Sequence, residues 1–84
     1  MKIIRPGLFV VLNRFPEHKD DAKRLFRKSE KFQTICEDFE SCVKALDHWN
    51  RSKEEIAVAR RAEYSAIIKE LEEEILQKLN EIRK

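Results

Sequence analysis

Apolar residues in the middle of the chain recur at alternating intervals of four and three positions. Five of them form one row at this spacing: Phe32, Cys36, Phe39, Val43 and Leu46. Three others form a neighbouring row at every seventh position: Ile35, Cys42 and Trp49. This alternation is the heptad pattern of a helix that packs against another helix, as in a coiled coil. It predicts a helix over residues 30–50, with an apolar stripe wider than one partner helix covers.

The last third of the chain carries a second stripe with helical spacing. Its members are Ala57, Tyr64, Ile68, Leu71, Ile75, Leu79 and Ile82, with Ile67 and Leu76 alongside. The stripe predicts a second long helix over residues 54–83. Five of its members are expected to meet the first row in the seam of a helix pair: Tyr64, Ile68, Leu71, Ile75 and Leu79.

A break between the two stripes predicts the connection. Asn50-Arg51-Ser52 interrupts the pattern, and Ser52-Lys53-Glu54-Glu55 has the spacing of a capping box. In such a box the Ser52 hydroxyl accepts a hydrogen bond from the amide of Glu55, and the Glu55 carboxylate accepts one from the amide of Ser52. We therefore expect a loop at residues 50–53. Because short loops join antiparallel neighbours, the predicted fold is an all-α, antiparallel helical hairpin.

The region before the hairpin is less regular. Phe15-Pro16-Glu17 is typical of a helix start and predicts a short helix over residues 16–28. Ser29 can cap a new helix, or the chain can run straight through it; the sequence leaves both open. Residues 1–14 form an N-terminal extension, flexible or packed on the hairpin domain of residues 15–84. Its segment 8–12 lacks helical periodicity and is expected to be extended or disordered.

The width of the first stripe bears on assembly. Five residues fall outside the seam of a two-helix hairpin and are the predicted dimer face: Ile35, Cys42, Trp49, Ile67 and Leu76. An exposed apolar patch of this kind marks an interface. We expect a homodimer with a four-helix arrangement that can also bind an unidentified protein partner. The alternative is that the N-terminal segment, with Phe9, Val10 and Leu12, folds back over the patch.

Composition and charge fit this picture and add a second hypothesis. The chain has 84 residues, 40% of them charged, and a single Gly. Such a small domain needs regular helix packing or oligomerisation to be stable. Its basic residues cluster in the first helical segment: Lys19, Lys23, Arg24, Arg27, Lys28 and Lys31. A basic strip over residues 19–31 can follow a phosphate backbone, which makes weak nucleic-acid association the alternative function.

Two features weaken the nucleic-acid hypothesis. Asp20 and Asp21 interrupt the basic strip. In an antiparallel hairpin the strip also lies near the acidic run at residues 70–74, so charge complementarity within the chain is expected to neutralise it. The self-associating module remains the preferred hypothesis.

Residue types that carry chemistry are sparse. Cys36 and Cys42 are six positions apart, which on a helix separates them by about 9 Å along the axis and about 240° around it, too far for a disulfide. The chain has no Cys-x-x-Cys motif, no His pair at helical ligand spacing and no Gly-rich phosphate loop. We expect no catalytic, cofactor-binding or metal-binding residues, and therefore no enzyme.

The predicted setting is the cytoplasm. Two reduced cysteines are typical of a cytosolic protein. The apolar stretch at residues 8–12 is much shorter than the roughly 18 residues of a membrane span, and no small-residue cleavage site follows it. We expect no membrane association.

Several residues match those of a known family. Phe15-Pro16-Glu17 corresponds to a Phe-Pro-Glu start, and Leu71-Glu72-Glu73-Glu74-Ile75 is similar to a Leu-Lys-Asp-Glu-Met/Leu signature. Apolar residues also fall where that family has them, at Leu25, Phe32, Leu46 and Leu79. Over residues 15–80 the chain thus resembles the YdcH-like family of short bacterial helical-hairpin proteins of unknown function. It departs from the family at Cys42-Val43, where a Leu-Asp pair is usual, and at Glu72, where Lys is usual. The resemblance implies a helical hairpin in a bacterial cytoplasm and no site residues.

Overall fold

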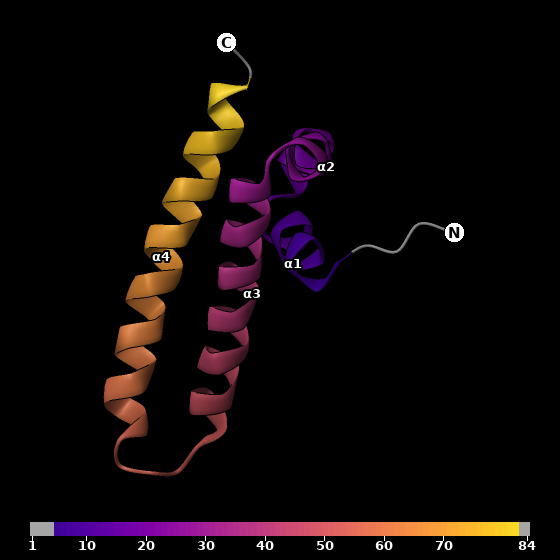
Figure 1. Ribbon diagram of the computed structural model, residues 1–84. Coiled ribbons are helices and arrows are strands. Elements are labelled where there is room, and N and C mark those ends of the chain that lie inside the picture. The colour runs from indigo at the N-terminus through magenta and orange to yellow at the C-terminus, as the bar shows by residue number, and fades with distance from the viewer. Residues whose placement is uncertain (1–4, 83–84) are drawn as a thin grey trace.

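The computed structural model describes residues 5–82, and over that range its regular secondary structure consists of helices, with no strand (Figure 1). Its elements are α1 (Pro6–Arg14), the 3-10 turn η1 (Pro16–His18), α2 (Lys19–Lys28), α3 (Glu30–Arg51) and α4 (Ala57–Glu81). The predicted all-α class is confirmed. The long helices α3 and α4 lie side by side, and α1 and α2 pack against α3 at the end away from the α3–α4 connection (Figure 1).

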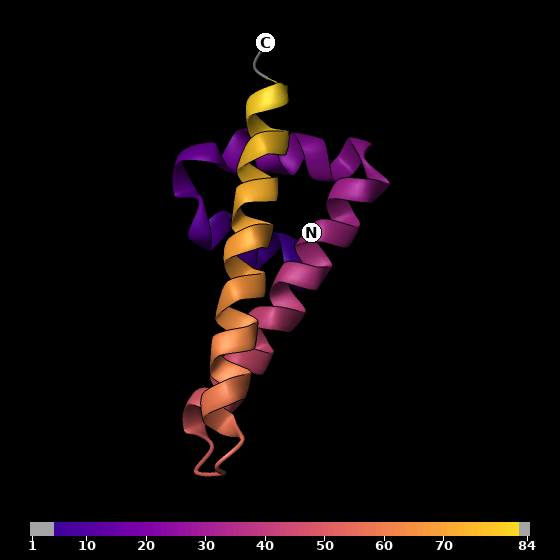
Figure 2. The ribbon, with the colours of Figure 1, turned by 90° about the vertical axis from the view of Figure 1, so that its left-hand side faces the viewer.

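The chain turns sharply between α2 and α3. Ser29 is extended there, with ψ of 113°, and its Oγ accepts a hydrogen bond of 3.1 Å from the amide of Phe32. The side-chain amide of Gln33 donates to the carbonyl of Phe26 at 2.6 Å and ties the two helices across the corner. Of the two possibilities open at Ser29, the structure has the cap and the bend, and α2 lies across the top of the molecule (Figure 2).

The N-terminal segment differs from expectation. Residues 8–12 were expected to be extended or disordered, but Pro6–Arg14 forms α1, with Pro6 in the first turn where its missing N–H costs nothing. Leu8, Val11 and Leu12 are buried, while Phe9 is 54% exposed. These three residues, spaced three and then one position apart, lie on one side of the helix. The apolar run at residues 8–12 is too short to show this helical period in the sequence. The expected extension at residues 1–14 is thus packed on the hairpin from Pro6 onward, and its residues 1–4 lie outside the described range.

The connection between the long helices also differs from the prediction. Helix α3 continues to Arg51 and α4 begins at Ala57, so the loop spans residues 52–56 rather than 50–53. Ser52 Oγ accepts from the amide of Glu54 at 3.1 Å, and not from that of Glu55. Ser52 is the C-cap of α3, while α4 starts after Ile56 without a side-chain cap. The predicted capping box is therefore wrong, because a serine directly after a helix can close a turn before the next helix begins.

The core lies where α1 and α2 meet the long helices. Its fully buried centre consists of apolar side chains from three helices: Val11, Phe32, Cys36, Phe39, Ile75 and Leu79. Gly7 allows the backbones of α1 and α3 to touch, since a Cβ at this position would lie 3.0 Å from the carbonyl carbon and oxygen of Cys36 and from the amide nitrogen of Glu37. Arg14 closes this core from outside. Its guanidinium carbon lies 5.6 Å from the centroid of the Phe39 ring, and Nη1 is 2.9 Å from Glu72 Oε2 on α4.

Burial is uneven along the long helices. On α3 the buried residues end at Phe39, and on α4 only Ala57 is buried before Ile68. Towards the loop, Val43, Leu46, Trp49 and Tyr64 are half-buried. Two helices alone shield each side chain from one direction only, so the third layer supplied by α1 and α2 decides where a closed core exists.

Candidate functional site

The structure brings most of the predicted seam together between α3 and α4. Six of the ten seam residues are buried: Phe32, Cys36, Phe39, Ile68, Ile75 and Leu79. Four are half-buried, three of them towards the loop: Val43, Leu46, Tyr64 and Leu71. The seam residues are thus structural.

The predicted dimer face is split among different environments. Ile35 is only 6% exposed and belongs to the core cluster that includes Leu8 and Val11, so α1 takes the place that a second copy was expected to take. Cys42 and Trp49 are half-buried in the half of the pair nearer the loop. Ile67 is 40% exposed and Leu76 is half-buried, both on the second half of α4. The alternative of coverage by the N-terminal segment therefore holds for Ile35.

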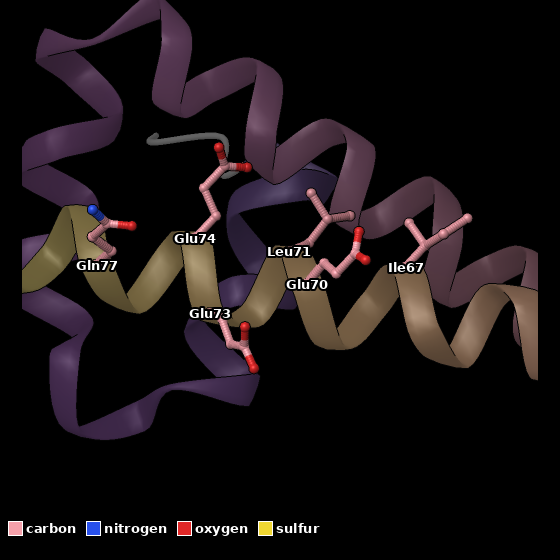
Figure 3. Close-up of a pocket in the computed structure, with 6 residues that line it drawn as sticks. All are labelled: Ile67, Glu70, Leu71, Glu73, Glu74 and Gln77. Atoms are coloured by element: carbon pink, nitrogen blue, oxygen red, sulfur yellow. The ribbon is translucent and has the colours of Figure 1, made fainter.

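The second half of α4 carries two adjoining hollows. One hollow of about 410 Å³ is lined by Ile67, Glu70, Leu71, Glu73, Glu74 and Gln77. An adjoining hollow of about 470 Å³ is lined by Glu73, Leu76, Gln77, Asn80 and Glu81. The two share Glu73 and Gln77, and together we call them the α4 groove. In Figure 3, Ile67 and Leu71 project from α4 towards α3, whereas Glu73 projects to the opposite side.

The α4 groove is lined by both apolar and acidic side chains. Among residues 5–82, no cation lies within ion-pair distance of Glu70, Glu73 or Glu74, although Glu81 has Lys78 at 3.9 Å. Three uncompensated carboxylates close together favour a cationic neighbour. The groove is open to solvent along α4, and a groove of this kind suits an elongated partner such as a helix rather than an enclosed small molecule.

A basic surface lies on α2. Because Ala22 and Phe26 are buried, the opposite side of this helix faces solvent, and its cations are exposed: Lys19, Lys23, Arg24, Arg27 and Lys28. We call these five residues the basic face of α2. None of them has an acidic partner among the described residues, and no ion pair joins α2 to α4. The expected neutralisation of the cluster by residues 70–74 of the same chain is not found; Glu72 pairs with Arg14 of α1 instead.

Sequence analysis missed the α4 groove. The acidic run at residues 70–74 was expected to neutralise the basic strip, and Ile67 and Leu76 were assigned to a dimer face together with residues of α3. The available signal was the interleaving of Ile67, Leu71 and Leu76 with Glu70, Glu73 and Gln77 at three- and four-residue intervals. Such a pattern indicates a helix surface on which apolar and acidic side chains are mixed.

The described residues show little that could do chemistry. No group of three or more His, Cys, Asp or Glu side chains within residues 5–82 is placed to hold a metal ion. In the same range, none of the helices has the length and apolar character to cross a bilayer. Both cysteines are free thiols. Burial, with a smaller contribution from the Glu37 charge, raises the pKa of Cys36 from 9.0 to about 12, and burial beside Asp38 also raises the pKa of Cys42.

The two thiols are expected to react at different rates. Cys36 is 0% exposed and stays protonated, so a thiol reagent at about pH 8 should label it only after unfolding. Cys42 is half-buried and should be labelled in the folded chain, slowly because its pKa is raised. Peptide mapping after timed labelling, with and without urea, measures both rates. Equal labelling of the two cysteines in the folded protein would contradict this prediction.

No protein-family model, no curated protein and no solved structure was found to match this chain. The resemblance to the YdcH-like family therefore stays a prediction that rests on the motifs quoted above.

Proposed function

We propose that this protein is a non-catalytic interaction module that associates with itself through the α4 groove. The observation that carries the proposal is the groove itself, where Ile67 is 40% exposed beside Leu71 and Leu76. Two of these residues, Ile67 and Leu76, were already expected in a dimer face. In this arrangement α4 of each copy contacts the second copy.

The size of the domain supports the proposal. A chain of 84 residues buries a limited core, and here the closed part of that core stops at Phe39 and Ile68. Covering Ile67, Leu71 and Leu76 would remove further apolar surface from water, at about 25 cal/mol per Å². Two free cysteines fit a reducing compartment, so the proposed setting is the cytoplasm.

The basic face of α2 supports a second candidate, which is weak association with nucleic acid. Five exposed cations along one helix face, without acidic partners in the described chain, can bind phosphates. The net charge of +2 and the acidic groove nearby disfavour this candidate, because a phosphate backbone extending past α2 would meet like charge on α4.

Replacing Ile67 by glutamate is expected to abolish self-association. The wild-type chain should sediment at twice its mass of 10.1 kDa, and the variant at that mass. The substitution removes the most exposed apolar side chain of the groove, and the added carboxylate repels those already there. Since the residue is exposed, the helical circular dichroism should not change. Sedimentation equilibrium measures the mass.

Val58→Glu is the matched control for this variant. Val58 is on the same helix and is 66% exposed, but it lies at the loop end, outside the groove. It should leave the dimer intact. A wild-type chain that stays monomeric at high micromolar concentration would overturn the proposed function. If both variants still form the dimer, the groove is not the dimer interface.

A further inference from the structure

We infer that the α4 groove receives the basic face of α2 from a second copy of this chain, so that the dimer is held by two reciprocal α2–α4 contacts. This inference rests on the proposed self-association and names the surface that occupies the groove. The two surfaces are of opposite charge, both are exposed, and neither is neutralised by the described residues of its own chain.

The spacing of the charges matches. Arg24 and Lys28 are four residues apart on α2, and Glu70 and Glu74 are four residues apart on α4. On a helix this interval corresponds to about 6 Å along the axis in both cases. Two cations on one helix can thus meet two carboxylates on another when the helices lie alongside each other.

The apolar residues of the groove suit the same side chains. Lys and Arg have long aliphatic stems that lie on apolar surface while the charged ends stay in water. Ile67 and Leu71 line the first hollow beside carboxylates, and Leu76 lines the second. A basic helix therefore fits both the apolar and the acidic residues of the groove, which an acidic or purely apolar helix does not.

The contact does not form within one chain. Buried Ala22 and Phe26 hold α2 against the body of the molecule, so its basic face points to solvent. Within residues 5–82, none of its five cations forms an ion pair with α4. A second molecule can bring that face to the groove.

The position of the two surfaces allows a closed dimer. Helix α2 and the second half of α4 both lie at the end of the molecule away from the α3–α4 loop (Figures 1 and 2). A two-fold axis near that end brings α2 of each copy to α4 of the other, as in an isologous interface. Both charged surfaces of each copy are then paired with the other copy, and no surface of this kind remains to bind a third copy.

Charge reversal tests the inference. One variant, Arg24→Glu with Lys28→Glu, makes the α2 surface acidic; a second, Glu70→Lys with Glu74→Lys, makes the groove basic. Each variant alone should raise the dimer dissociation constant at least tenfold, since like charges meet at both contacts. Mixed at equal concentration, the two should form a heterodimer, and a chain with all four substitutions should again form a homodimer. Sedimentation and native mass spectrometry give the masses.

Matched controls carry the same charge changes at the loop end. Arg51→Glu with Lys53→Glu, and Glu54→Lys with Glu55→Lys, alter exposed residues far from both surfaces. They should keep the wild-type dissociation constant. Dimerisation of the wild type should also weaken between about 0.1 and 1 M salt, where the screening length falls from about 10 to about 3 Å.

The outcomes separate the hypotheses. Wild-type dimers that persist in both reversed variants would overturn the α2–α4 contact while leaving self-association in place. A monomeric wild type would overturn the proposed function itself. A further outcome is that the wild type binds a DNA duplex in a salt-dependent way, and that Arg24→Glu with Lys28→Glu abolishes this binding without changing the mass of the protein. That result would assign the basic face to nucleic acid and overturn the inference.

Discussion

Replacing Phe39 by alanine is expected to lower the free energy of unfolding by about 3–5 kcal/mol, the range for removing a fully buried aromatic side chain. The ring is 0% exposed and lies where the seam meets the α1 layer. It also carries the Arg14 guanidinium at 5.6 Å, so its loss removes one support of the Arg14–Glu72 ion pair. Against a total stability of about 5–15 kcal/mol for a typical domain, this change leaves a marginal fold.

Urea unfolding followed by far-UV circular dichroism measures the effect. Phe9→Ala is the control, because it removes the same side chain from a position that is 54% exposed. Its effect should stay within about 0.5 kcal/mol, as for other surface substitutions. Equal losses for the two variants would mean that Phe39 is not at the centre of the core.

Gly7→Leu is expected to detach α1 from α3. Any side chain at this position starts with a Cβ 3.0 Å from backbone atoms of Cys36 and Glu37, and a helix backbone cannot give way as a flexible side chain can. Leucine itself favours helices, so the cost lies in the packing. Separation would expose Leu8, Val11 and Leu12, each worth about 1.5–3 kcal/mol when fully buried, and we expect a loss of about 3 kcal/mol or more.

Limited proteolysis shows whether α1 has separated, since cleavage within residues 6–14 needs a released helix. Asn13→Leu introduces the same side chain at an exposed position of α1 and should leave both protease resistance and stability unchanged. If Gly7→Leu is as resistant as Asn13→Leu, the close approach of α1 and α3 is not required.

Periodicity sufficed for the long helices because each one repeats its pattern over several turns. Rows such as Phe32, Cys36 and Phe39 identified α3, and Ile68, Ile75 and Leu79 identified α4. Helix α1 was missed because nine residues hold only two and a half turns, and Val10 and Val11 have a preference for strands. Its helical state follows from docking against α3, which a local pattern does not contain.

The same limit explains the errors at Ile35 and at the loop. Ile35 was assigned to a dimer face because nothing in its own helix shows that α1 covers it. Ser52 fits a cap motif on either side of the loop, and its role was decided by where α3 ends, one residue earlier. The charged surfaces were visible as clusters in the sequence. Their position at the same end was also expected from the hairpin, but the sequence did not show that they remain unpaired among residues 5–82.

The closed core at one end and its absence at the other divide the long helices into two regions of different local stability. Near the loop, opening a turn of α3 and α4 exposes the small buried side chain of Ala57 and half-buried side chains such as Leu46 and Tyr64, which costs little beyond the hydrogen bonds. Near α1 and α2, opening requires the whole core to separate. Local unfolding of the α3–α4 pair is therefore expected to begin at the loop, while the end packed against α1 and α2 stays folded. A partner bound at that far end would slow hydrogen exchange there without protecting the loop.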